Sequence, residues 1–210
     1  MIIVKKVFLW GAGIIFSLAL VIGALFLDFN SPAKVCKYYE SGAARRGCFA
    51  FDGTVISVVE HPDVHLTVKY LNDFETGPIW YGDQKQIDGR VQFSVFVWSL
   101  PQVLHVSNDN TLYTAIYTIS DSSTGKDTIY LGLLSLEESS RGPLVLKNAV
   151  ALGSELSGDI FSVHLIKESD SSIDVVYSVP NRVQGEKING PANINTSTVE
   201  IFGERLQKVR

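Results

Sequence analysis

The sequence is short of the residue types that build the commonest active sites. It has four histidines and two cysteines among 210 residues, and its one methionine is Met1. No CxxC pair occurs with histidines at ligand spacing, so a zinc site of the usual kind is not expected. No G-x-S-x-G turn occurs, which argues against an α/β-hydrolase nucleophile. The sequence therefore predicts no catalytic residue, no bound metal and no cofactor.

The chain also lacks an excess of positive charge. It has 18 lysines and arginines against 22 aspartates and glutamates, for a net charge of −4. Proteins that bind nucleic acids neutralise phosphates with clustered basic residues. Nucleic acid is therefore not an expected partner.

One long apolar run organises the chain. Val7–Leu27 contains no charged residue, and a helix of about 20 residues crosses the ~30 Å hydrocarbon core of a bilayer. We therefore expect a single-pass transmembrane anchor that makes the membrane itself a partner. The positive-inside rule alone does not decide the orientation, because Lys34, Lys37, Arg45 and Arg46 follow the run within the counted window. Lys5 and Lys6 nevertheless abut the run, Asp28 is the first charge after it, and a long polypeptide after a first helix is usually the translocated part. We therefore expect a cytoplasmic N-terminus, residues 1–6, and an extracytoplasmic remainder.

Two other processing patterns fit this region less well. A cleaved signal peptide has an apolar core of roughly 7–15 residues and a small-x-small site, whereas the exit here, Ala24–Asp28, is bulky. Ser31 and Ala33 have that spacing, but a proline separates them. A lipoprotein signal would end at Cys36, yet Lys34 stands too close before it. An uncleaved anchor is the preferred interpretation.

Both cysteines follow the anchor, in a juxtamembrane segment, residues 28–52. Outside the cytoplasm, Cys36 and Cys48 are expected to form a disulfide, which closes a short loop containing Arg45 and Arg46. Free thiols are the alternative if the orientation is reversed. A short helix is expected to begin at Ser31-Pro32 and to end at Ser41-Gly42.

The rest of the chain has the pattern of an all-β domain, residues 53–204, followed by a basic tail, residues 205–210. No helical periodicity of useful length occurs outside the anchor, and short alternating runs are separated by turn residues. This spacing predicts an antiparallel sandwich or barrel-like domain. The strand-like runs are Thr54–Val59, Val64–Tyr70, Ile79–Tyr81, Val91–Trp98, Leu112–Ile119, Thr128–Leu136, Leu144–Leu146, Ile160–Ile166, Ile173–Val179 and Thr198–Phe202, with Asn148–Leu152 either a strand or an irregular link.

Several of these runs carry a resemblance. They are IYLGLL from Ile129, NAVALG from Asn148, IDVVY from Ile173 and R-x-x-G-E from Arg182. With them, residues 128–202 resemble a C-terminal module of uncharacterised secreted or membrane-anchored bacterial proteins. Those proteins often carry a D-x-N-x-D-G turn upstream, of which Ser107–Asn110 keeps only part, so calcium binding is not supported. The resemblance implies an envelope location and no known activity.

Aromatic residues in the strands are a candidate binding surface. Aromatic faces suit sugars and wall polymers, and the residues considered are Trp80, Tyr81, Phe96 and Trp98, with Tyr113 and Tyr117. The favoured alternative is that these rings pack a core or cover the second face of a sheet, because aromatics are ordinary strand residues.

The histidines offer two weaker candidates. His61 and His65, with Glu60 and Asp63, have the composition of a metal site, but Pro62 and the β pattern favour a solvated turn. His105 and His164 lie in strand-like runs, where either would need a nucleophile or carboxylate brought to it by the fold.

The sequence thus favours a non-enzymatic binding or structural module of the cell envelope, whose partner is an envelope protein or a wall polymer. An envelope hydrolase with its site near His105 or His164 is the alternative. A pilin-like subunit is disfavoured, because the apolar run has no acidic residue near its start and no pilin-type leader.

Overall fold

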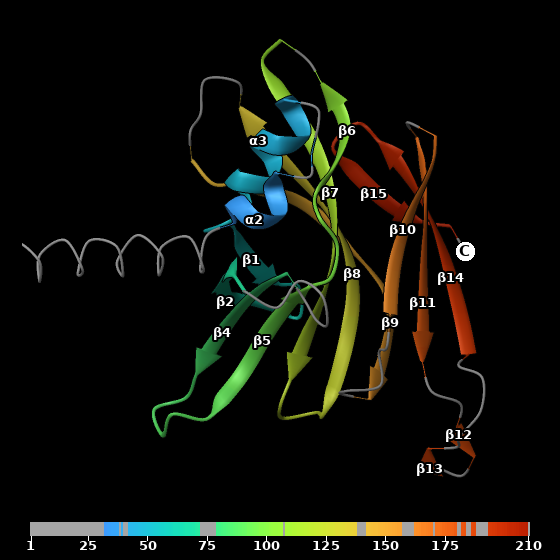
Figure 1. Ribbon diagram of the computed structural model, residues 1–210. Helices are drawn as coiled ribbons and strands as arrows, with labels where there is room; N and C mark the ends of the chain where they lie inside the picture. Colours follow the sequence, from blue (N-terminus) through green and yellow to red (C-terminus); the bar gives the residue numbers. More distant parts are fainter. Residues whose placement is uncertain are drawn as a thin grey trace, which may run out of the picture.

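The described part of the protein is mostly β-strand. The computed structural model describes residues 32–37, 39, 42–71, 79–106, 108–137, 142–156, 162–169, 171–179, 182–183, 186–187 and 193–209. A nearly closed, barrel-like sheet carries a second sheet on one side (Figure 1), which confirms the predicted mostly-β fold. The predicted anchor lies outside the described residues, and within them no helix is both long and apolar enough to cross a membrane.

The first sheet contains nine strands. Its hydrogen-bonded order is β2-β1-β9-β8-β7-β5-β4-β3, and β6, which contains the strand-like run around His105, pairs with β7. The strands are β1 Val55–Val58, β2 His61–Thr67, β3 Lys69–Tyr70, β4 Trp80–Lys85, β5 Val91–Val97, β6 Gln102–Val106, β7 Asn110–Asp121, β8 Lys126–Glu137 and β9 Val145–Leu156.

The two ends of this sheet belong to one continuous segment. Only Val68 separates β2 from β3, and its N–H donates to the carbonyl oxygen of Thr54 at 2.9 Å. β2 pairs with β1, whereas β3 pairs with β4, so the bent segment joins the two edges. Gly82 of β4 makes this approach feasible, since a Cβ there would lie 2.5 Å from the carbonyl oxygen of Thr67. The result is a nearly closed barrel with little exposed edge.

The start of β2 differs from the prediction of a turn over residues 60–63. The turn is shorter, and β2 begins at His61. Its pairing with β1 is irregular, because Val58 pairs with His61 whereas Ser57 pairs with His65. The irregularity accommodates Pro62, which has no N–H to donate to a sheet.

The second sheet packs against the outside of the barrel. Its order is β10-β11-β14-β15, and β12 and β13 form a separate two-stranded hairpin. The strands are β10 Ser162–Ser169, β11 Ser172–Val179, β12 Arg182–Val183, β13 Glu186–Lys187, β14 Asn193–Phe202 and β15 Arg205–Lys208.

Residues 205–208 of the expected basic tail form a strand. β15 pairs with β14, and the side chain of Leu206 is buried. The N–H of Leu206 donates to Asn148 Oδ1 of β9 at 3.0 Å, and Lys208 Nζ donates to the carbonyl oxygen of Leu152. The sequence did not predict a strand here because Leu206 is the one buried residue among exposed, mostly charged neighbours. β15 joins the second sheet to the barrel.

Two apolar cores result from this arrangement. The inner face of β7 places Tyr113, Ala115 and Tyr117 in the barrel interior. The opposite face of the same strand places Leu112 and Ile116 in a second core between the two sheets. Burial on both faces explains why β7 and β8 read as nearly continuous apolar runs.

The helices differ from the single short helix predicted over residues 32–40. α2 spans only Ala33–Cys36, and a longer helix, α3, spans Gly42–Ala50. Ser41-Gly42 was expected to end a helix, whereas α3 begins at Gly42. The buried face of α3 consists of Ala44, Gly47 and Cys48. These are small residues, and so α3 lacks the apolar periodicity that predicts a helix.

Candidate functional site

A disulfide fixes the two helices to each other. Cys36 of α2 and Cys48 of α3 are bonded, with a Cα–Cα distance of 5.6 Å, and both are fully buried. The predicted pairing is confirmed. The closed loop includes Arg45 and Arg46, and so the bond holds the helix that presents both arginines.

α3 packs on one end of the barrel (Figure 1). Gly47 lets α3 lie close to Tyr113, because a Cβ at this position would be 2.1 Å from Cε1 of that ring. The Tyr113 hydroxyl donates to the carbonyl oxygen of Ala43 at 2.8 Å. Tyr39, between the helices, donates to the carbonyl oxygen of Pro101 at 3.0 Å, and burial raises its pKa to about 12. These contacts orient α3 on a rigid support.

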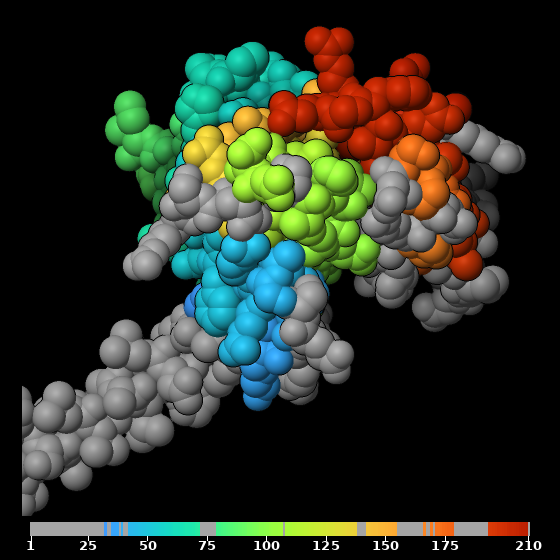
Figure 2. All heavy atoms as spheres, turned by 90° about the horizontal axis from the view of Figure 1, so that it is seen from above, coloured from blue at the N-terminus to red at the C-terminus, as the bar shows by residue number. Residues whose placement is uncertain are grey.

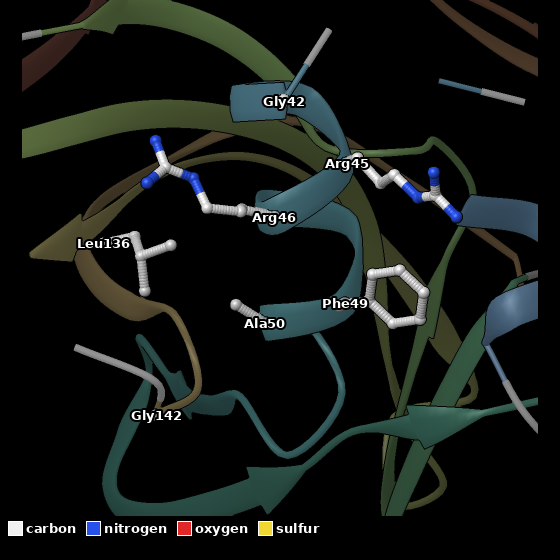
Figure 3. Close-up of a pocket in the computed structure, with 7 residues that line it drawn as sticks. All are labelled: Gly42, Arg45, Arg46, Phe49, Ala50, Leu136 and Gly142. Carbon is white, nitrogen blue, oxygen red and sulfur yellow. The ribbon is translucent and has the colours of Figure 1, made fainter. Parts of the chain in front are cut away.

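An open hollow of about 370 Å³ lies between α3 and the end of β8. We call it the α3 groove; its lining residues are Gly42, Arg45, Arg46, Phe49, Ala50, Leu136 and Gly142. In Figure 3, Arg46 extends toward Leu136 on one side of the helix, whereas Arg45 and Phe49 lie together on the other side. The groove thus combines an apolar floor with guanidinium groups at its rim.

The charge of α3 has one sign. The helix contains two arginines and no acidic residue, and both arginines are exposed. The side chain of Phe49 is 40% exposed. Among the neighbouring acids, Asp52 accepts a hydrogen bond from the N–H of Tyr70 at 2.7 Å, and Glu137 is exposed at the end of β8. Figure 2 shows α2 and α3, in blue, standing on the surface beside the light-green region of β6 and β7.

Comparison of the chain with family models, with curated proteins and with solved structures finds no match. The resemblance of residues 128–202 to a bacterial envelope module therefore stays a prediction. The functional argument for this protein rests on its own geometry.

The expected aromatic surface is divided between two faces of the barrel. Trp80 is fully buried in the barrel interior, so it does not belong to an exposed surface. Tyr81 and Phe96 pair across β4 and β5 on the outer face, with ring centroids 5.1 Å apart, and each is partly exposed. Trp80 follows the favoured core-packing alternative, because alternation places Trp80 and Tyr81 on opposite faces of one strand.

The outward rings have fixed positions. The Tyr81 hydroxyl donates to Asp83 Oδ2 at 3.1 Å; burial, followed by this hydrogen bond and the Asp83 charge, raises the pKa of Tyr81 to about 12. Trp98 Nε1 donates to Thr118 Oγ1 at 2.9 Å, and the indole packs against the second core. Tyr81, Phe96 and Trp98 therefore remain as the outward members of the predicted surface.

Tyr113 and Tyr117 belong to the barrel interior, as the core-packing alternative predicts. Tyr117 stacks on Tyr130 with a centroid distance of 5.5 Å, and the Tyr130 hydroxyl donates to the Glu60 carboxylate at 2.7 Å. Burial, then the neighbouring Tyr130 and Glu60, raises the pKa of Tyr117. Sequence reasoning did not find this cluster, because Glu60 and Tyr130 are brought together only by the barrel.

The histidines do not converge on a catalytic or metal arrangement within the described residues. His61 and His65 are exposed on β2, and His65 Nδ1 lies 3.0 Å from Ser57 Oγ. His105 is exposed on β6, and His164 belongs to β10 of the other sheet, its side chain lying outside the described part. No three His, Cys, Asp or Glu side chains gather as metal ligands in the part of the chain that the structure describes.

Proposed function

We propose that this protein is a membrane-anchored, extracytoplasmic β-domain that acts as a non-enzymatic binding module of the cell envelope. The anchor is Val7–Leu27, the N-terminal residues 1–6 are cytoplasmic, and the partner is an envelope protein or wall polymer. The observation that carries this proposal is the buried Cys36–Cys48 disulfide. Disulfides of this kind persist outside the cytoplasm and are rare within it.

The position of the disulfide supports the anchor. Cys36 follows the end of the uncharged run by nine residues. An oxidised pair so close to an apolar segment of membrane-spanning length fits a chain that emerges from the bilayer and folds on the oxidising side.

A binding role fits the surface better than a reaction does. The described residues place an apolar groove with cationic rims at one end of the barrel, and partly exposed Tyr81 and Phe96 on its outer face. Aromatic rings and guanidinium groups are enriched where proteins bind partners. The exposed His105 has no nucleophile or carboxylate hydrogen-bonded to it within the described part of the chain, and the hydrolase alternative gains no support from it.

The test is the thiol state of the full chain in whole cells. A membrane-impermeant thiol reagent is applied with and without a reductant, and labels are counted by intact mass. We expect no label without reductant, two labels after reduction, and a mass that retains the apolar run. Free thiols reached only after cell lysis would place the domain in the cytoplasm and overturn the proposal.

A further inference from the structure

The geometry points to the α3 face as the surface that rests on the membrane, where Arg45 and Arg46 bind the phosphates of anionic lipid headgroups. This inference rests on the proposed anchor and adds the partner of the α3 groove. It is carried by three observations: the length of the tether, the charge of the helix and the exposure of Phe49.

The tether is short. Five residue steps separate Leu27, the end of the apolar run, from Pro32, the first described residue. Fully extended, they span about 17 Å. α2 begins at Ala33, and the disulfide fixes α3 to α2. The end of the barrel that carries α3 is therefore held near the bilayer, whatever the orientation of the rest of the domain.

The segment that carries α2 and α3 has a small excess of positive charge. Residues 28–52 contain four basic and three acidic residues, whereas the full chain has a net charge of −4. Guanidinium groups bind phosphate through paired hydrogen bonds and remain charged at all physiological pH values. Arg45 is exposed and makes no ion pair within the described residues. An anionic membrane surface is a complementary partner that the short tether brings close to it.

The apolar part of the face suits an interface. Phe49 lies beside Arg45 in Figure 3 and is 40% exposed. Helices that lie on membranes combine basic residues with exposed Phe, Leu or Trp at the boundary between headgroups and acyl chains. The groove volume of about 370 Å³ falls within the range of small-ligand sites, so it is large enough for a headgroup.

The experiment measures arginine reactivity of the full chain in lipid nanodiscs. Discs of phosphatidylcholine alone are compared with discs that also contain phosphatidylglycerol, using phenylglyoxal and mass spectrometry of the fragments. We expect labelling of Arg45 and Arg46 to slow about five-fold in the anionic discs, the factor equivalent to ~1 kcal/mol per basic residue near an anionic surface. Arg90 is the matched control: it is exposed, paired with Asp88 on the β4–β5 hairpin away from α3, and its rate should not change.

A second measurement does not depend on charge. The variant Phe49→Trp adds one tryptophan, and we expect lipids brominated near the headgroup to quench its emission. The control Ile87→Trp adds a tryptophan at a fully exposed position, and its emission should not be quenched. Equal Arg45 rates in the two disc types would overturn the inference while the anchor stands. Equal slowing by inorganic phosphate in neutral detergent would also overturn it, by showing an anion site that needs no membrane. Extraction of the chain from liposomes at alkaline pH would refute the anchor, and the inference with it.

Discussion

At the scale of single residues, the contact between α3 and the barrel depends on a glycine. Gly47 faces the ring of Tyr113, which is fully buried, and its missing side chain lets the helix approach. The Tyr113 hydroxyl is held by the carbonyl oxygen of Ala43 on the same helix. A larger residue at position 47 would therefore have to displace either this buried ring or the helix.

We predict that Gly47→Ala lowers the free energy of unfolding by about 1–3 kcal/mol, the usual cost of overpacking a core. The added methyl group would lie 2.1 Å from the Tyr113 ring and would displace α3. Urea unfolding followed by circular dichroism measures the change. Gly42→Ala is the matched control on the same helix: a Cβ there meets nothing within 4 Å, so stability should stay equal or rise by up to ~1 kcal/mol. Equal losses in the two variants would contradict the packing argument.

At the scale of elements, the disulfide joins two short helices to each other, and α3 also packs on the barrel. α2 is four residues long and α3 is nine, and isolated helices of such lengths are not stable in water. They are held in place by the disulfide between them and by the packing of α3 against the barrel.

We predict that Cys36→Ser with Cys48→Ser lowers the free energy of unfolding by about 3 kcal/mol, because the unfolded chain regains the entropy of the open loop. The free energy of unfolding of the unmodified protein, measured by urea unfolding, should fall by the same amount on reduction, and the double variant should not respond to reductant. Hydrogen exchange should show the loss of protection to be greatest in α3. If the reductant does not change the urea midpoint of the unmodified protein, the disulfide does not stabilise the fold and this prediction is wrong.

At the scale of the whole molecule, folding desolvates the hydroxyl groups of tyrosines in several separate places. Tyr39 lies between the helices, Tyr81 on the outer face, and Tyr117 and Tyr130 in the barrel interior. Burial is the first cause of the raised pKa in each case. Because the folded state holds these protons more tightly than the unfolded state, folding and tyrosine ionisation are linked.

We predict that the fold loses stability at alkaline pH. The pKa values of Tyr39 and Tyr81 rise from 10 to about 12, so their contribution is complete below pH 10 and is lost as the pH rises through 12. Tyrosinate absorbance and circular dichroism, followed together against pH, should show late ionisation coinciding with unfolding. Tyr39→Phe and Tyr81→Phe should each remove one late-ionising group. Titration of all eight tyrosines near pH 10 with the fold intact would contradict the prediction.

The strand positions were largely predictable, whereas the candidate site was predictable only in part. β5, β7 and β8 have strong β patterns and appear where expected. The sequence also placed Arg45 and Arg46 in a disulfide loop. It gave no reason to expect a groove there, because Leu136 and Gly142 reach α3 only through the folding of the barrel.

The sequence by itself determined the β character of the chain and which two cysteines could form a disulfide. Alternation and turn residues are local properties, and two cysteines allow only one pair within a chain. Only the tertiary structure decided which face of each strand is inside, since β5, β7 and β8 carry apolar residues on both faces. Barrel closure at Gly82, the strand β15 and the seat of α3 on Tyr113 depend on contacts between residues far apart in the chain. Such contacts depend on how the assembled sheets pack, and local sequence patterns do not predict that packing.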